Sequence, residues 1–226
     1  MANILMVVTT QDRLGTTGSL TGLWFEDFVT PYYLFGDAGA TITLASPLGG
    51  PAAVDPRSDG PSNQAEAVRR FRQDRNARSA LADTLRLEQL DPKDFDGAFY
   101  PGGAGAMWDL ADDLQSASLL SALHASGTPI ALVGYGVAAL RRAIDQDTHP
   151  LVEGRTVTGL SNSEERAAGL AGMVPFSLED ELIRLGANYR KGPDGAPHVI
   201  RDGALITGQN TISAAGVARK LLDTPR

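Results

Sequence analysis

Short apolar runs alternate with longer amphipathic segments along the first 46 residues. The run NILMVV occupies residues 3–8, and the amphipathic segment after it ends at Gly39. A second short run, TITLAS, occupies residues 41–46. Runs of this length predict buried strands, whereas apolar residues spaced three and four apart predict a helix. This part of the chain is therefore predicted to form a strand, a helix and a second, parallel strand.

The same alternation resumes after a polar, helix-forming segment from Ser62 to Leu90. It predicts an α/β fold, a doubly wound and mostly parallel sheet sandwiched by helices. Residues 1–226 are expected to form one domain with a helical insertion at about 60–92, because this length suits a single core. The Pro/Gly-rich stretch at 46–61 is expected to be a long surface loop. The remaining predicted elements are strands at 96–100, 129–133, 155–160 and 204–208, and helices at 112–127, 177–186 and 212–222.

Charge and hydropathy narrow the classes of partner. The net charge is −7 and the sequence pI is near 4.9, which argues against nucleic acid or another polyanion. The arginines from Arg69 to Arg78 alternate with polar residues and are interpreted as a solvated helix face. The N-terminal apolar run is short and lacks the basic region of a signal peptide, so a cytoplasmic protein without a membrane partner is expected.

Two residue types limit the chemistry of any site. The sequence contains no cysteine, which excludes disulfides, thiolate metal sites and thiol catalysis by this chain. The histidines are His124, His149 and His198, and none follows a predicted strand directly. They form neither a His-x-His motif nor a pair four residues apart, so they are interpreted as surface or packing residues, and no metal and no cofactor are expected.

Doubly wound folds bind ligands at the carboxyl ends of their strands. After the strand at 96–100, Gly102 and Gly103 let backbone amides approach a ligand, which suits an oxyanion hole or, equally well, an ordinary tight turn. After the strand at 129–133, Gly134-Tyr135-Gly136 has the strand-turn-helix outline of a nucleophile elbow, and glycine tolerates the positive φ of such a turn.

A third segment, SNSEE at 161–165, places Glu164 and Glu165 in the first turn of a predicted helix capped by Ser161 or Ser163. Together with FYPGGAGAMWDL at 99–110 and the stretch at 21–50, it closely resembles the DJ-1/PfpI (ThiJ/PfpI) superfamily. The nearest branch is the chaperone and glutathione-independent glyoxalase III-like one. The resemblance covers nearly the whole chain and implies a flavodoxin-like fold and a homodimer. It extends to DPRS at 55–58, GRTVTGL at 154–160, VPFSLEDEL at 174–182 and LITGQN at 205–210.

The resemblance also implies roles for site residues. In that branch a cysteine at the elbow is the nucleophile, a histidine is its partner, a glutamate on the first helix is the acid/base and a later glutamate orients the histidine. These roles map to Gly134, Tyr135, Asp27 with the adjacent Glu26, and Glu165. Only Glu165 matches in kind, and the histidine of the branch's P-G-G-H-G motif is replaced by Ala104. Activities that need the thiolate are therefore not expected here. Whether Glu26 or Asp27 faces the pocket is left open.

Two interpretations of this altered site remain. In the preferred one, Asp27, Tyr135 and Glu165 surround an enlarged pocket and carry out cofactor-free proton transfer on a small carbonyl compound, as in a lyase, hydratase, cyclase or isomerase. In the other, the protein is a chaperone-like or ligand-binding member, or it keeps residual glyoxalase or deglycase-like activity. Met107 is expected beside the cleft, and the aromatic side chains there favour a substrate larger and more apolar than methylglyoxal. The expected binding residues are Gly102, Gly103, Ala104, Gly134, Trp24 and Trp108.

Overall fold

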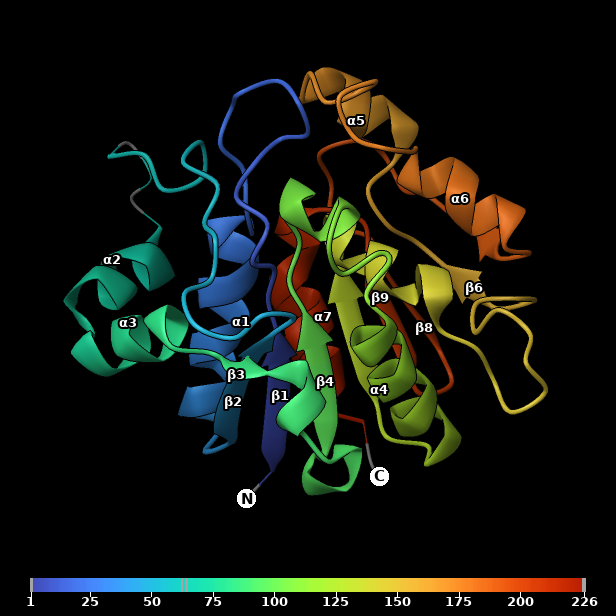
Figure 1. The fold of residues 1–226 in the computed structure, drawn as a ribbon, viewed down its shortest axis with the longest axis horizontal. Helices are drawn as coiled ribbons and strands as arrows, with labels where there is room; N and C mark the ends of the chain where they lie inside the picture. Colours follow the sequence, from blue (N-terminus) through green and yellow to red (C-terminus); the bar gives the residue numbers. More distant parts are fainter. Residues whose placement is uncertain (1, 62, 64, 225–226) are drawn as a thin grey trace.

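A computed structural model describes residues 2–61, 63 and 65–224 as an α/β fold built on a seven-stranded sheet (Figure 1). The strands of this sheet are β1 Asn3–Val7, β2 Thr41–Ser46, β3 Leu85–Arg86, β4 Gly97–Tyr100, β5 Ile130–Val133, β8 Val199–Asp202 and β9 Leu205–Gly208. Their order is β3-β2-β1-β4-β5-β9-β8, and every neighbouring pair is parallel except β8 and β9. The mostly parallel, doubly wound sheet predicted from the sequence is confirmed.

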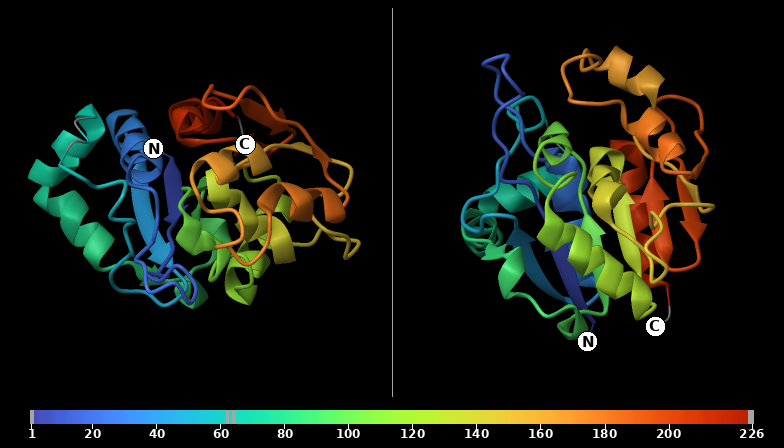
Figure 2. Two further views of the ribbon diagram at one scale, coloured as in Figure 1. Left: turned by 90° about the horizontal axis from the view of Figure 1, so that it is seen from above. Right: turned by 45° about the vertical axis from the view of Figure 1, so that its right-hand side comes forward.

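Helices cover both faces of this sheet. They are α1 Phe25–Asp37, α2 Glu66–Gln73, α3 Arg75–Ala82, α4 Leu114–Ala125, α5 Asn162–Ala167, α6 Leu178–Arg184 and α7 Ala214–Leu222. Successive side chains of a strand point to opposite faces, so Leu5 and Val7 of β1 share a core cluster with α4, whereas Ile4 and Met6 share one with α1 and α7. Seen from above, α1 and α7 lie on one side and α4 on the other (Figure 2, left). Within the described residues, no helix is long and apolar enough to cross a membrane.

The segment predicted to be helical from Ser62 to Leu90 contains two helices, and Ser62 itself lies outside the described residues. Asp74 separates α2 from α3, because its backbone leaves the helical region at φ −87° and ψ 101° and its side chain accepts a hydrogen bond from Ala77 N–H. The helical prediction is wrong after Ala82, where the chain turns into β3 at the edge of the sheet. The arginines of α2 and α3 are exposed or half-buried, as interpreted.

The strand predicted at 155–160 is shorter than expected and lies outside the main sheet. It is β6, Thr156–Val157, and it pairs with β7, Asn188–Tyr189, in a separate two-stranded sheet. The place beside β5 is taken by β9, and Thr158 N–H donates to the Thr207 hydroxyl instead of joining the ladder. The chain after β6 therefore leaves the main sheet and crosses its carboxyl edge, where α5 and α6 lie (Figure 2, right).

The Pro/Gly-rich stretch at 46–61 is a loop with most of its residues exposed or half-buried, as expected, but two residues of its second half, Asp55 and Ser58, are buried. Val54 forms a parallel bridge with Leu23 just before α1, and Asp55 is fully buried. The Asp55 carboxylate accepts hydrogen bonds from the Arg57 side chain and the Thr21 hydroxyl, which satisfy the buried charge. This half of the loop thus packs against the residues that open α1.

Glu181 in α6 fastens that helix to the 3-10 helix η4, Gly134–Arg142, and its charge is expected to stabilise the fold. Hydrogen bonds from Arg184 Nε at 2.7 Å and Arg141 Nε at 2.8 Å hold the pKa of Glu181 down at about 2. Glu181→Gln is expected to cost about 1–2 kcal/mol at pH 7. A carboxyl group whose pKa is lowered by folding stabilises the native protein at pH values above its ordinary pKa, and this stabilisation is lost as the pH falls. The stability difference between native protein and Glu181→Gln should therefore narrow between about pH 5 and pH 2.

Urea unfolding of native protein and variant at pH 7 and pH 4 measures that deficit. Glu88→Gln is the matched control, because Glu88 pairs with Arg86 at 3.0 Å on the exposed surface and its loss should change stability by less than about 0.5 kcal/mol. Equal losses in the two variants, or a Glu181→Gln deficit that grows at low pH, would contradict the role given to Glu181.

Candidate active site

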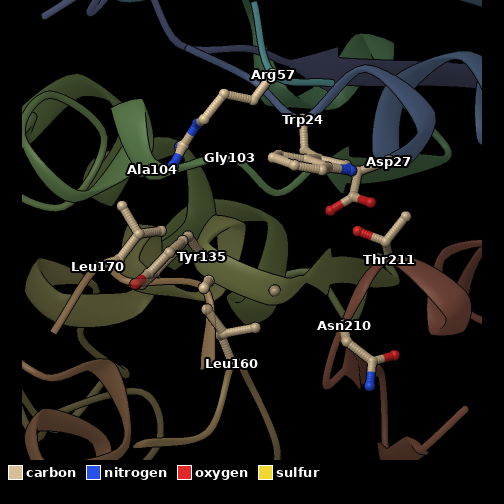
Figure 3. A pocket seen from close by; sticks show the side chains of 12 residues that line it. Trp24, Asp27, Arg57, Gly103, Ala104, Tyr135, Leu160, Leu170, Asn210 and Thr211 are labelled. Carbon is tan, nitrogen blue, oxygen red and sulfur yellow. The ribbon is translucent and has the colours of Figure 1, made fainter. Parts of the chain in front are cut away.

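A cavity of about 150 Å³ lies at the carboxyl edge of the sheet (Figure 3). Its walls come from the start of α1, the 46–61 loop, the turns after β4, β5 and β9, and the chain around α5. The lining residues are Trp24, Asp27, Arg57, Gly103, Ala104, Gly134, Tyr135, Leu160, Ala168, Leu170, Asn210 and Thr211. Because β1 lies between β2 and β4 in the sheet, the strand order reverses here, at the place where doubly wound folds bind ligands.

Asp27 is a buried carboxyl group on the wall of this cavity. It lies in the first turn of α1 and is 2% exposed, and its Oδ1 atom has no hydrogen-bond partner among the described residues. Burial raises the pKa of Asp27 from its ordinary value of 3.8 to about 7, with a smaller upward contribution from the charge of Glu26. The Thr211 side chain and the Gly102 backbone offset part of this effect. Asp27 therefore exchanges its proton near neutral pH.

Gly134 forms the elbow predicted after β5. Its φ is +56°, and a Cβ placed on it would lie 3.5 Å from Asp27 Oδ2 and 3.8 Å from Gly102 Cα. These are ordinary van der Waals distances, so a side-chain carbon would fit at the elbow beside the carboxyl group without overlap. The missing side chain at Gly134 thus leaves room for a ligand next to Asp27.

Gly102 and Gly103 permit a close approach between the turn after β4 and the start of α1. Gly103 has φ +125°, and a Cβ on it would overlap the carbonyl oxygen of Gly22 and the backbone nitrogen of Trp24. The Gly102 carbonyl accepts a hydrogen bond from Trp24 N–H at 2.8 Å. Gly103 and Ala104 line the cavity, whereas Gly102 contacts Asp27 from behind it. Close packing explains both glycines, and Gly103 and Ala104 still border the cavity.

Tyr135 and Glu165 form a buried pair on the other side of the cavity. The Tyr135 hydroxyl donates a hydrogen bond to Glu165 Oε2 at 2.9 Å, and it points away from Asp27 (Figure 3). Burial, followed by the charge of Glu165, raises the pKa of Tyr135, and burial also raises the pKa of Glu165. Glu165 does not line the cavity. It orients Tyr135, in the place where the resemblance expects an orienting glutamate, and the three predicted groups do not converge on one point.

Glu26 and Trp108 lie outside the cavity. Trp108 was expected to line it, whereas the choice between Glu26 and Asp27 was left open. Glu26 Oε1 accepts a hydrogen bond from Asn63 Nδ2 at 2.7 Å and faces an adjoining surface groove, so Asp27 is the residue of the pair that faces the cavity. Trp108 packs beside Gly15, because the 3-10 turn η3, Ala104–Met107, carries it away from the cleft. Met107 is fully buried in the core.

The sequence analysis assigned no role in the site to several of the residues that line the cavity. Arg57 comes from the 46–61 loop, and Asn210 and Thr211 come just after Gln209 at the end of β9, so the run of polar residues that follows that strand was the signal available. Glu164, next to Glu165, accepts hydrogen bonds from Gln209 Nε2 at 2.8 Å and Asn210 Nδ2 at 2.7 Å. Glu164 thus fixes the turn that presents Thr211. The remaining unpredicted lining residues are Leu160, Ala168 and Leu170.

No family model matches the chain, but individual proteins do. The chain is 36% identical over 144 residues to the bovine (Bos taurus) glutamine amidotransferase-like class 1 domain-containing protein 1, a match that covers 63% of this chain and 65% of that protein. The matched region thus spans slightly less than two thirds of that relative's length. A longer match, 26% identical, joins 97% of the chain to 96% of the glutathione-independent glyoxalase HSP31 of Saccharomyces cerevisiae.

Solved structures also resemble the whole fold at higher identity. Among them is the rapid encystment protein of 24 kDa from Francisella tularensis, which superposes with a TM-score of 0.94 and 33% sequence identity. The superposition covers 99% of this chain and 98% of that one. The likeness therefore includes the helices over the carboxyl edge as well as the central sheet.

Proposed function

The chain belongs to the DJ-1/ThiJ/PfpI superfamily, and on that premise we propose that it is a cofactor-independent acid/base enzyme acting on a small carbonyl compound. The reaction would be of the lyase, hydratase, cyclase or isomerase type. The observation that carries the proposal is Asp27, a buried carboxyl group with a pKa near 7 on the wall of a cavity. General acid/base groups work best when their pKa lies near the operating pH.

Relatives of the chain include proteins named as glyoxalases, yet Gly134 stands at the elbow and the chain has no cysteine. We propose that the chemistry has moved from an elbow thiolate to Asp27. The Asp27 carboxylate takes a proton from the carbon next to the carbonyl group, the electron pair of that C–H bond forms a C=C bond, and the π pair of the C=O bond moves onto the carbonyl oxygen. Return of the proton to carbon or to oxygen completes the transfer, and the backbone of Gly103 and Ala104 borders the oxygen.

Proton exchange tests this proposal without knowledge of the natural substrate. In D₂O the native protein is expected to speed exchange of the α-protons of at least one compound in a panel of small ketones, aldehydes and 2-oxo acids, followed by NMR. The rate should rise as the pH passes through about 7 and then level off, because the ionised form of Asp27 is the base. Exchange no faster than in buffer for every compound would contradict the proposal.

Tyr135→Phe is expected to affect this exchange much less than the loss of Asp27 does. The hydroxyl of Tyr135 is engaged by Glu165 and does not face Asp27, so exchange should fall by less than about 10-fold. The variant leaves the Glu165 carboxylate without its donor, which should cost about 1–3 kcal/mol of stability. Exchange rates and urea unfolding of the same samples check both expectations. Abolished exchange in a stably folded Tyr135→Phe protein would make Tyr135 the proton-transfer group instead.

A further inference from the structure

We propose that Arg57 binds the carboxylate of the substrate, which makes the substrate class a small 2-oxo carboxylic acid. This inference rests on the proposed acid/base function and names the compounds that the same cavity takes. Among the described residues that line the cavity, Arg57 is the only cation and Asp27 the only acid. A mostly apolar cavity with one cation favours a ligand that carries one negative charge.

The guanidinium of Arg57 presents an unused edge. Its Nε donates to Asp55 Oδ1 at 2.9 Å and its Nη2 donates to Asp55 Oδ2 at 2.6 Å. Within the described part of the chain, Nη1 makes no hydrogen bond to the protein. A planar guanidinium has five N–H donors, so one fork can hold Asp55 while the other receives a second carboxylate. The side chain is 43% exposed, which leaves that edge open to a ligand.

The surrounding contacts hold Arg57 at a fixed place relative to Asp27. Leu23 N–H donates to Ala53 O at 2.8 Å, and Asp55 N–H donates to Leu23 O at 2.9 Å. The Ser58 hydroxyl accepts a hydrogen bond from Phe25 N–H at 3.0 Å. These bonds join the loop that carries Arg57 to the first residues of α1, the helix that carries Asp27. The cation and the acid are therefore positioned by one hydrogen-bonded unit.

Trp24 lines the same cavity as these two groups. The Arg57 guanidinium carbon is 6.0 Å from the centre of the Trp24 ring, and Figure 3 shows that ring between Arg57 and the Asp27 carboxyl group in this view. A ligand that spans the ring would place its carboxylate at Arg57 and its keto group toward Asp27. In a 2-oxo acid the keto carbon is bonded directly to the carboxylate carbon. The protons to be transferred are on the carbon on the other side of the keto group.

Charge and size favour a small monoanion over a larger or dianionic ligand. Arg57 already shares its charge with Asp55, so a dianion such as a phosphate ester would bring more uncompensated negative charge toward the Asp27 carboxylate than a monoanion does. A cavity of about 150 Å³ is also filled by a carboxylate and a short chain. A monoanion with a short aliphatic chain fits both limits, and Leu160 and Leu170 provide apolar contacts for the chain.

Binding of 2-oxobutyrate and of its uncharged amide, 2-oxobutanamide, by ligand-observed NMR tests this proposal on the native protein. The carboxylate is expected to bind about 10- to 100-fold more tightly than the amide, the range of a charge-assisted hydrogen bond. The ratio should fall to near 1 in Arg57→Gln, and also in the double variant Arg57→Gln/Asp55→Asn, which leaves no buried unpaired charge if the single variant folds poorly. Equal binding of the two compounds by native protein, or an unchanged ratio in a folded variant, would overturn the proposal.

Arg70→Gln is the matched control. Arg70 also forks onto a carboxylate, Asp37, and also lies over an aromatic ring, 4.0 Å from the centre of Tyr33, but it does not line the cavity. Its loss should leave the binding ratio unchanged. If neutral ketones exchange their protons in an Asp27-dependent way and carboxylates are not preferred, the role of Arg57 is overturned but the proposed acid/base function is not. A carboxylate preference without any exchange would contradict the proposed function and support Arg57 as an anion site.

Discussion

Asp27→Asn is expected to abolish α-proton exchange and, at the same time, to stabilise the folded protein at pH 8. General acid/base groups contribute about 10²- to 10⁴-fold to rate, and asparagine cannot accept the proton. The side chains have nearly the same shape, so the cavity should persist. Loss of activity together with a gain in stability is the behaviour of a group held in an environment that opposes its charge.

The sign of the stability change follows from the raised pKa of Asp27. Between about pH 4 and pH 7 the folded protein keeps a proton on Asp27 that the unfolded chain has released, so the native protein loses stability as the pH rises through this window. One pKa unit corresponds to about 1.4 kcal/mol, and the loss therefore approaches about 4 kcal/mol above pH 8. The asparagine variant does not lose this stability. The gain in its free energy of unfolding over that of native protein should be near zero at pH 4 and greatest at pH 8.

Urea unfolding at pH 4, 6 and 8, with exchange rates on the same samples, measures both effects. Asp109→Asn is the matched control, because Asp109 is also a largely buried aspartate whose pKa is raised by burial. Asp109 accepts hydrogen bonds from Thr9 Oγ1 at 2.8 Å and from Thr10 N–H at 2.8 Å, so its replacement should lower stability by about 1–3 kcal/mol and retain exchange. An Asp27→Asn protein that keeps full exchange, or that is less stable than native protein at pH 8, would contradict the role of Asp27.

Gly103→Ala is expected to destabilise the protein by about 3 kcal/mol or more. Its φ of +125° is costly for any residue with a Cβ, by about 1–3 kcal/mol. The added methyl group would also meet the backbone of Gly22 and Trp24, and overpacking of this kind typically costs a further 1–3 kcal/mol or so. Because these contacts are to backbone atoms, relief requires movement of the start of α1, and exchange should fall with stability.

Gly39→Ala is the control that separates the cost of the steric clash at position 103 from the cost of a positive φ. Gly39 has φ +79° and no atom within 4 Å of the position of a Cβ, so this variant should lose only about 1–2 kcal/mol. Thermal and urea unfolding of the two variants measure the difference. Equal losses would show that the turn after β4 does not pack tightly against α1.

The order of strands and helices could be predicted because local patterning decides it. The runs at 3–8 and 41–46 became β1 and β2 with bounds that differ by at most one residue. The choice between Glu26 and Asp27 could not be made in this way, because the neighbouring Phe25 and Phe28 are both buried and the apolar face of α1 includes both sides of the pair. Packing against the turn after β4 makes the choice.

Arg57 had no sequence prediction because its position depends on contacts between distant segments. The Asp55 carboxylate meets the Thr21 hydroxyl across 34 residues of chain, and no local pattern in a Pro/Gly-rich loop encodes that meeting. Trp108 was misplaced for a related reason, since the direction of its side chain is set by the short 3-10 turn η3 that precedes it. Loops and short turns thus decide which side chains reach the cavity.

The ¹³C carboxyl shift of Asp27, followed through a pH titration of native protein and assigned by its absence in Asp27→Asn, tests the proposed chemistry most directly. A midpoint near pH 7 is expected, with the protonated form dominant at pH 6. A midpoint near 4, the ordinary value for an aspartate, would mean that Asp27 is fully ionised at neutral pH and would contradict its role as the acid/base group of this site.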